Sequence, residues 1–322
     1  MNQPETIRKR LQKVDLLRGF ALIGMVIYHF SWDLSYFSYI TPEIPAEGIL
    51  RLLARCIAFC FLFVCGFSLY LAHGKKIRWH AFFRRLFVIV MAACLVSLVS
   101  FLVMPQGLIY FGILHEIAVT SVIALLFLHT PVFINLVAIA FFWVTPYFYQ
   151  SDLFNAPYLL WIGFCASPLP SFDYVPVFPW FSAGLAGLTI ARIVDFFHAF
   201  QYLERGIRPR WLNSIVGWMG RHSLIFYLIH QPVLLAIIYC FSVVFPPSLA
   251  TLRTPMERSC VAECQTKQPD SNLCIDFCDC VFNGFETQNL IGAFSKGEIG
   301  QTDPRLQTIV NACWRQIVGK LN

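Results

Sequence analysis

The chain has 322 residues, of which 57% are hydrophobic and 13% are charged. Soluble domains carry about 25% charged residues, so this composition excludes an ordinary water-soluble enzyme. The net charge of +6 comes from residues 1–250, which hold 17 Lys and Arg against 10 Asp and Glu, whereas residues 251–322 hold 7 against 8. Because the excess lies in the apolar part, it indicates membrane topology and not a nucleic-acid partner. The sequence predicts an integral membrane protein.

Seven apolar runs are long enough to cross the hydrocarbon core of a bilayer, which takes about 20 residues in a helix. They lie near residues 16–38, 49–72, 83–104, 108–129, 131–149, 175–194 and 223–245. An eighth run, Tyr158–Cys165, is too short to span and is bracketed by Pro157 and Pro168. The predicted fold is therefore all-α: a polytopic bundle of seven transmembrane helices with one short re-entrant or interfacial helix at 158–165.

Basic residues gather on one side of these spans. They precede the first run, follow the second and follow the sixth: Arg8, Lys9, Arg10 and Lys13; Lys75, Lys76, Arg78, Arg84 and Arg85; and Arg205, Arg208 and Arg210. Positive residues stay on the cytoplasmic side of a membrane, so the N-terminus and both basic loops are expected there. Seven spans then place the C-terminus outside. We expect a cytoplasmic N-terminus (1–15), a membrane domain (16–250) and an extracytoplasmic tail (251–322).

The twelve cysteines divide evenly between the spans and the tail. Those of the tail form two pairs spaced i,i+4 and two further residues: Cys260 and Cys264, Cys274 and Cys278, then Cys280 and Cys313. Residues four apart lie on one face of a helix, so the spacing predicts two helices joined by residues 265–273 and tied by disulfides. The disulfide connectivity stays open. A metal site is a weaker alternative because the tail has no histidine, and free thiols are a third.

The first apolar run carries ionisable residues at membrane depth, where such groups are functional candidates. No small-x-small cleavage site follows closely, so we expect an uncleaved helix. Arg18 and His29 are eleven residues apart, which puts them on one helix face about 16 Å apart. Asp33 lies one turn beyond His29, where it could hydrogen-bond the imidazole. Each residue has a structural alternative: Arg18 could simply reach lipid headgroups, and His29 could simply hydrogen-bond a neighbouring carbonyl. Taken together with Asp33, they suggest a contact for the donor substrate and a proton acceptor.

Other polar residues offer further candidates, each with a structural alternative. His115 lies in the fourth run at nearly the depth of His29 and is a second catalytic candidate, unless it only packs. His230 and Gln231 precede Pro232 in the last run, where they could line a polar cavity or accompany a kink. Arg55, with Arg51 at the outer end of the second run, could hold an anionic acceptor or anchor the helix at the interface.

Two surface segments each allow two interpretations. The outer loop 168–181 holds Asp173 and Trp180 among prolines and aromatics, which suits a sugar-binding platform or an aromatic belt. The basic cluster 75–85 is mainly a topology signal and a contact for anionic lipid. Binding of coenzyme A phosphates is its less favoured interpretation. No metal site and no tightly bound cofactor are predicted.

Several blocks of the sequence, read together, resemble a known family. They are Asp15-x2-Arg18-Gly19 through Met25-x3-His29, residues 109–115, residues 220–232, and the loop from Asp173 to Pro179-Trp180. The chain resembles, over roughly residues 10–245, the bacterial branch of the heparan-α-glucosaminide N-acetyltransferase-like membrane proteins. The wider superfamily resembles surface-glycan O-acetyltransferases with an Arg-x10-His motif, which Arg18 and His29 match. The resemblance implies acyl-CoA handling for Arg18 and catalysis for His29.

These observations lead to one favoured function and two alternatives. The favoured function is an acyltransferase of the bacterial inner membrane. It would move an acyl group, in the first place acetyl, from cytoplasmic acyl-CoA to a hydroxyl or amine of an envelope glycan outside. His29, oriented by Asp33, would act as base or carry the acyl group. The alternatives are a transporter or flippase with a polar path, and a membrane anchor that displays the disulfide-tied tail.

Overall fold

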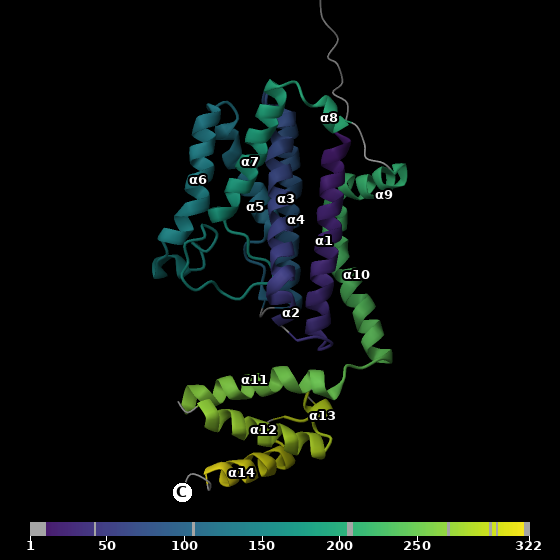
Figure 1. Cartoon of the computed structure of the whole chain (residues 1–322), viewed down its shortest axis with the longest axis vertical. Helices are drawn as coiled ribbons and strands as arrows, with labels where there is room; N and C mark the ends of the chain where they lie inside the picture. Colours follow the sequence, from purple (N-terminus) through teal and green to yellow (C-terminus); the bar gives the residue numbers. More distant parts are fainter. Residues whose placement is uncertain are drawn as a thin grey trace, which may run out of the picture. The chain divides into compact units, whose positions relative to one another are not determined.

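The computed structural model describes residues 11–41, 43–104, 107–204, 209–268, 271–295, 298–300 and 302–318, and within them it is built from helices (Figure 1). The chain divides into two compact units, each described by itself. The first unit comprises Met1–Val26 and Leu52–Gln231, and the second comprises Ile27–Arg51 and Pro232–Asn322. The basic residues Arg8, Lys9, Arg10, Arg205 and Arg208 lie outside the described residues.

Each of the seven apolar runs forms a helix, which confirms the predicted all-α membrane fold. Five helices are long and apolar enough to cross a bilayer: α1 (Gln12–Tyr36), α3 (Gly48–His73), α4 (Trp79–Val103), α7 (Val177–Phe196) and α10 (Ser223–Val244). Two more are apolar but shorter, α5 (Ile113–Ile123) with the 3₁₀ turn η2 (Ala124–Phe127), and α6 (Val132–Phe148). Seven full crossings therefore remain a prediction, whereas five are supported by helix length.

The short helix expected at 158–165 is not there, and this prediction was wrong. Those residues form successive turns, closed by hydrogen bonds such as Ile162 N–H to the Leu159 carbonyl at 3.0 Å. Gly163 has a φ of +104°, which no helix accommodates. The carbonyls of Trp161 and Ile162 instead accept hydrogen bonds from the first residues of α7. Backbone pairing with α7 therefore replaces the helix that the apolar composition suggested.

Glycines let the helices of the first unit approach closely. A Cβ at Gly66 of α3 would overlap the carbonyl oxygen of Gly184, and a Cβ at Gly187 would overlap the carbonyl oxygen of Phe63. Small residues at such crossings are how membrane helices gain packing without a hydrophobic driving force. Helix α7 is thereby held against α3, while α6 packs along α7. The centre of this packing is filled by fully buried side chains: Phe181, Leu185 and Leu188.

A short helix, α9 (Arg210–Arg221), packs against the start of α1 by the same means. A Cβ at Gly19 would overlap the carbonyl of Val216, and a Cβ at Gly220 would overlap the carbonyl of Asp15. Figure 1 shows α9 at a steep angle to α1, from which it extends sideways. The sequence analysis treated these residues only as part of a basic loop and did not predict this helix. The remaining short elements of the chain are α2 (Glu43–Ala46), η3 (Asp152–Asn155) and α8 (Gln201–Glu204).

The tail of the second unit is the disulfide-tied helical hairpin that the cysteine spacing predicted. Helix α11 (Leu249–Lys267) is joined to α12 (Ser271–Thr287) by two disulfides, Cys260–Cys278 and Cys264–Cys274. The two cysteines farther from the connection between the helices bond each other, and so do the two nearer ones, as antiparallel helices require. A third disulfide, Cys280–Cys313, ties α12 to α14 (Pro304–Val318). With α13 (Ile291–Ser295), these helices enclose a small apolar core that includes Phe282, Phe285 and Leu306.

Candidate functional site

A cavity of about 710 Å³ lies within the first unit. Helices α1, α3, α4, α5 and α10 supply its walls, so segments far apart in the sequence meet there. Its volume is within the range of small-molecule binding sites, about 300–1,000 Å³. The lining includes cationic and polar side chains, and apolar ones: Arg18, His80, Arg84, Arg85 and Ser223; Phe61, Ile113, Leu114 and Leu224.

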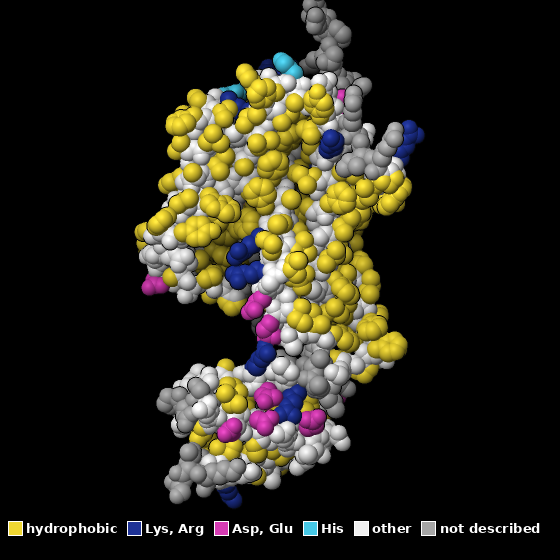
Figure 2. All heavy atoms as spheres, viewed as in Figure 1, with side chains coloured by type: hydrophobic (Ala, Val, Ile, Leu, Met, Phe, Trp, Pro, Cys, Tyr) yellow, Lys and Arg dark blue, Asp and Glu magenta, His cyan; other side chains and the backbone are white. Residues whose placement is uncertain are grey.

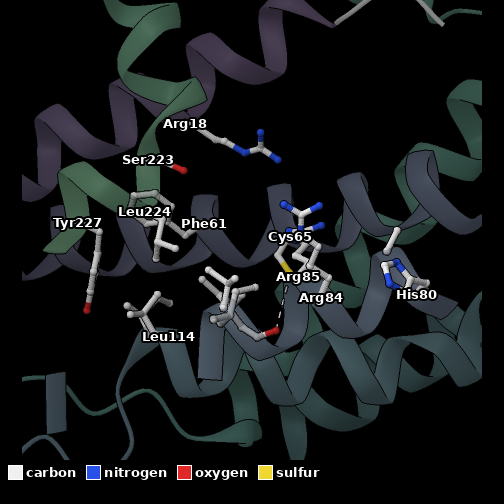
Figure 3. A pocket seen from close by; sticks show the side chains of 15 residues that line it. Arg18, Phe61, Cys65, His80, Arg84, Arg85, Leu114, Ser223, Leu224 and Tyr227 are labelled. Atoms are coloured by element: carbon white, nitrogen blue, oxygen red, sulfur yellow. Dashed lines mark hydrogen bonds between the residues drawn. The ribbon is translucent and has the colours of Figure 1, made fainter. Parts of the chain in front are cut away.

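The cationic end is built from two helices. Arg18 projects from α1, and its guanidinium donates a hydrogen bond of 2.6 Å to the Ser68 hydroxyl and pairs with Asp15 at 3.5 Å. Arg84 and Arg85 come from the second turn of α4 and are exposed. Figure 3 shows the guanidinium groups of Arg18 and the α4 arginines around the same space, with His80 at its edge. Three fixed positive charges in one cavity suit a polyanionic ligand.

The opposite end is closed by Tyr227 of α10, which Figure 3 shows on the far side of the cavity from His80. The Tyr227 hydroxyl donates a hydrogen bond of 3.3 Å to the Asp173 carboxylate, and the same oxygen accepts one of 2.8 Å from the Ile113 N–H. Asp173 thus fixes the start of α5 and the ring of Tyr227 together. A Cβ at Gly112 would overlap this carboxylate, so glycine is required beside it.

Asp173 lies in the loop before α7, partly buried, and is not among the cavity-lining residues. Burial raises the pKa of its carboxyl to about 6, although the hydrogen bonds from Ile113 and Tyr227 oppose the rise. A short backbone pairing between Phe111 and Tyr174 holds the loop in place, with the Val175 N–H bonded to the Phe111 carbonyl at 3.0 Å. Asp173, which the sequence analysis suggested for substrate binding, therefore contacts other protein residues and supports the cavity wall.

Both ring nitrogens of His115 have protein partners. Its Nδ1 accepts a hydrogen bond of 3.2 Å from the Gly112 N–H, and its Nε2 lies 3.3 Å from the Ser97 hydroxyl. Since that hydroxyl donates to the Ile109 carbonyl at 2.6 Å, the proton between His115 and Ser97 belongs to the imidazole. This arrangement favours the packing interpretation of His115 that the sequence left open. The neighbouring Glu116 is fully buried, and it accepts a 2.7 Å hydrogen bond from Thr120.

His29 and Asp33 lie on α1, which is helical without a break from Gln12 to Tyr36. Arg18 and His29 both lie within this helix, eleven residues apart. His29 is partly buried against the ring of Tyr28, whose centroid is 5.7 Å away, and Asp33 is 3% exposed. His29 and Asp33 belong to the second unit, and Arg18 belongs to the first.

The remaining candidates occupy separate places. Arg55 is exposed on α3, and Trp180 of α7 packs against an apolar cluster that contains Leu62 and Val175. His230 bonds through Nδ1 to the Tyr227 carbonyl at 2.7 Å, one turn back on α10, and Gln231 follows it next to Pro232 inside the helix. None of these four appears among the residues that line the cavity.

Two groups of residues that line the cavity were not singled out as site candidates from the sequence. Arg84 and Arg85 were assigned mainly to topology, with binding of coenzyme A phosphates as the less favoured interpretation, because a run of charge beside a span has that meaning in most membrane proteins. Tyr227 carries no signal of its own in an apolar run. Only the fold brings these residues to one cavity, since α4 and α10 are separated by more than a hundred residues in the chain.

Comparison with known proteins identifies the family. The model of the family described as "Heparan-alpha-glucosaminide N-acetyltransferase, catalytic" matches residues 10–232, which contain Arg18, the α4 arginines and Tyr227. The tail lies beyond the match. No curated protein and no solved structure matches the chain. Its membrane helices and this match, over more than half its length, indicate an acetyltransferase-type membrane enzyme; the chain belongs to the heparan-alpha-glucosaminide N-acetyltransferase catalytic family.

Proposed function

We propose that the protein is an acyltransferase that takes an acyl group, in the first place acetyl, from acyl-CoA at the cytoplasmic face of the bacterial inner membrane. The acceptor would be a hydroxyl or amine of an envelope glycan on the outer side. The N-terminus and the basic loops would be cytoplasmic, and the tail periplasmic. The observation that carries the proposal is the cavity in which Arg18, Arg84 and Arg85 come together, in a chain of an acetyltransferase family.

The cavity supplies what an acyl-CoA donor requires. Coenzyme A carries several phosphates and a long, weakly polar pantetheine arm. The phosphates would bind at Arg84, Arg85 and His80, and Arg18 would hold the part nearest the arm. The apolar wall formed by Phe61, Ile113 and Leu224 would cover the arm and exclude water from the thioester. Arg18 is well placed for this because Asp15 and Ser68 fix its guanidinium.

The chemical step would use His29 as general base. His29 takes the proton of the acceptor hydroxyl or amine, and the acceptor oxygen or nitrogen attacks the thioester carbonyl carbon. A new C–O or C–N bond forms, the C–S bond breaks, and the proton passes to the departing coenzyme A sulfur. Asp33, one turn further along α1, would hold the imidazole in the required tautomer. A transient acyl group on His29 is the other form of this step.

Binding of the acceptor would use residues that the sequence analysis singled out. Trp180 and Arg55 would face a glycan near the outer ends of α7 and α3, and His230 and Gln231 would add polar contacts from α10. His115 would act only by holding the start of α5, since Gly112 and Ser97 occupy its nitrogens. Asp173 would hold the Tyr227 ring in place at the end of the donor cavity that lies opposite His80.

The test is acyl transfer in membranes that contain the full chain. Membranes from cells lacking the gene receive wild-type protein or His29→Ala, together with acetyl-CoA labelled in the acetyl group. The wild type should transfer label to the glycan or lipid fraction of the envelope. His29→Ala should lose at least about a hundredfold of this rate, the order of magnitude that a general base contributes, with unchanged amounts of inserted protein.

His222→Ala is the matched control, because His222 is an exposed histidine that follows α9 and does not line the cavity. It should keep the wild-type rate. Full activity in His29→Ala would remove the proposed base. Substrate flux without label transfer would assign the protein to the transporters.

A further inference from the structure

Helix α9 carries an apolar stripe that stays largely exposed, although one of its members, Trp218, contacts the ring of Phe226 at the start of α10. Trp211, Ile215 and Trp218 are spaced i, i+4 and i+7, so they lie within about 60° of one another around the helix axis. Their exposed fractions are 61%, 57% and 49%. The opposite face is the one that packs on α1, where Val216 and Gly220 are buried. Two tryptophans and an isoleucine on so short a helix form a contact surface.

The same helix has a separate cationic side. Arg210, Ser214 and Arg221 lie close together around the axis and about 80° from the apolar stripe, and all three are exposed. In Figure 2, dark-blue side chains lie toward the top at the outer end of α9, with yellow side chains below them. The helix thus has one face packed on the protein, one exposed apolar face and one exposed cationic face. This pattern is typical of a helix that lies in the plane of a membrane surface.

The surroundings of α9 agree with a position at the lipid boundary. It extends sideways from α1 (Figure 1), and α10, a helix long and apolar enough to cross a membrane, begins directly after its C-terminal residues. Its contact with α1 is at Asp15 and Gly19, one to two turns from the start of that helix. One to two turns rise by about 5–10 Å, which is the depth of in-plane helices when a spanning helix begins at the membrane surface. Tryptophan is enriched at this level of a bilayer.

We infer that α9 is an in-plane helix that binds the anionic lipid surface at the basic end of the bundle. Trp211, Ile215 and Trp218 enter the boundary of the acyl chains, and Arg210 and Arg221 bind headgroup phosphates. The binding stands apart from the reaction proposed above. It borders the donor cavity, however, because Gly19, which contacts α9, directly follows the cavity residue Arg18, and the cavity residue Ser223 follows α9 within two residues.

Photocrosslinking of the full chain tests the apolar stripe. The chain is reconstituted in vesicles of equal parts phosphatidylcholine and phosphatidylglycerol, with Ile215→benzoylphenylalanine or Asp276→benzoylphenylalanine as the only probe. Asp276 is an exposed residue of the tail helix α12, outside the proposed lipid contact, so it serves as the control. Phospholipid adducts should form at least about five times more often at position 215. Equal capture at both positions, or capture of a protein at 215, would overturn the proposal.

The arginines are tested by the lipid that is captured. Adducts at position 215 should contain phosphatidylglycerol and phosphatidylcholine at a ratio of about five to one, compared with one to one in the vesicle, the effect of one cation near an anionic surface. Arg210→Gln/Arg221→Gln should return the adducts to the ratio of the vesicle. Lys75→Gln/Lys76→Gln removes the same charge from the exposed connection between α3 and α4 and should keep the enrichment. Enrichment that survives in the Arg210→Gln/Arg221→Gln variant would contradict binding of headgroups by α9.

Discussion

Among single residues, Asp173 has the clearest consequence for stability. Its carboxyl accepts hydrogen bonds from the Ile113 N–H and the Tyr227 hydroxyl, and its pKa is raised to about 6 because it is buried. A raised pKa means that the folded protein holds the proton more tightly than the unfolded chain. The stabilisation from protonated Asp173 is therefore complete below about pH 4, the range of an ordinary aspartate, and is lost as the pH rises through about 6.

Asp173→Asn should abolish this pH dependence. The asparagine carbonyl still accepts from Ile113, but it does not ionise, so the variant should not lose stability between pH 4 and pH 7 from this site. The wild type should lose at most about 3 kcal/mol over that range, the equivalent of two pKa units. Thermal unfolding in detergent at a series of pH values measures the difference. Asp152→Asn, which removes an exposed charge from the same loop, is the control; identical profiles for wild type and Asp173→Asn would contradict the account.

The individual site residues show where sequence reasoning stops. Arg18 could be singled out because a guanidinium inside an apolar run is costly and needs a reason. The hydrogen-bond partners of Asp173 lie 60 and 54 residues away along the chain, and no local pattern indicates them. The role of His115 was left between catalysis and packing, and only the positions of Gly112 and Ser97 bear on it.

At the scale of helices, the glycine contacts between α3 and α7 are the most sensitive point. Gly187→Ala would put a methyl group onto the carbonyl oxygen of Phe63, a backbone atom that cannot turn away. Overpacking of this kind costs about 1–3 kcal/mol, and a shift of α7 would also move Thr120 beside Gly184. We expect a lower melting temperature in detergent and less monodisperse protein.

Gly217→Ala, in α9, is the matched control. A methyl group there would have only the Arg221 guanidinium for a neighbour, at 3.5 Å, and alanine is a better helix former than glycine. That variant should be as stable as the wild type or slightly more stable. If Gly187→Ala unfolds at the wild-type temperature, the close α3–α7 contact is not formed as described.

The helices themselves were largely predictable, and the exceptions have physical causes. Apolar runs of about 20 residues have few other structures available in a bilayer, so each run became a helix. The run 158–165 did not, because Gly163 and pairing with α7 gave its backbone other hydrogen bonds. Helix α9 went unrecognised because twelve residues with two internal glycines look like a loop, although the i, i+4, i+7 spacing of Trp211, Ile215 and Trp218 was a readable signal.

At the scale of the whole molecule, the chain consists of a part that the family model matches and a disulfide-tied tail beyond that match. The match ends at residue 232, whereas the six paired cysteines all lie between Cys260 and Cys313. The tail core is small, and short segments of this kind are commonly stabilised by disulfides because they bury too little apolar surface. The spacing of the cysteines was enough to predict the hairpin, but the pairing required the structure.

Arg253 adds an ion-pair network to the tail. Its guanidinium lies 3.0 Å from Glu257, 2.6 Å from Asp279 and 2.9 Å from Glu286, so one side chain of α11 joins two acids of α12. These pairs are partly exposed, and each contributes less than about 1 kcal/mol. Disulfides and the apolar core therefore account for most of the order in this segment, which has no part in the proposed acyl transfer.

The central claim is that the arginine-lined cavity holds the acyl-CoA donor, and acetyl-CoA affinity of the purified full chain tests it most directly. Arg84→Gln/Arg85→Gln should weaken binding by about ten- to a hundredfold, as expected when charge-assisted hydrogen bonds to phosphate are lost. Lys75→Gln/Lys76→Gln, which removes equal charge outside the cavity lining, should bind like the wild type. Equal affinity in all three proteins, or equal weakening in both variants, would contradict the donor site.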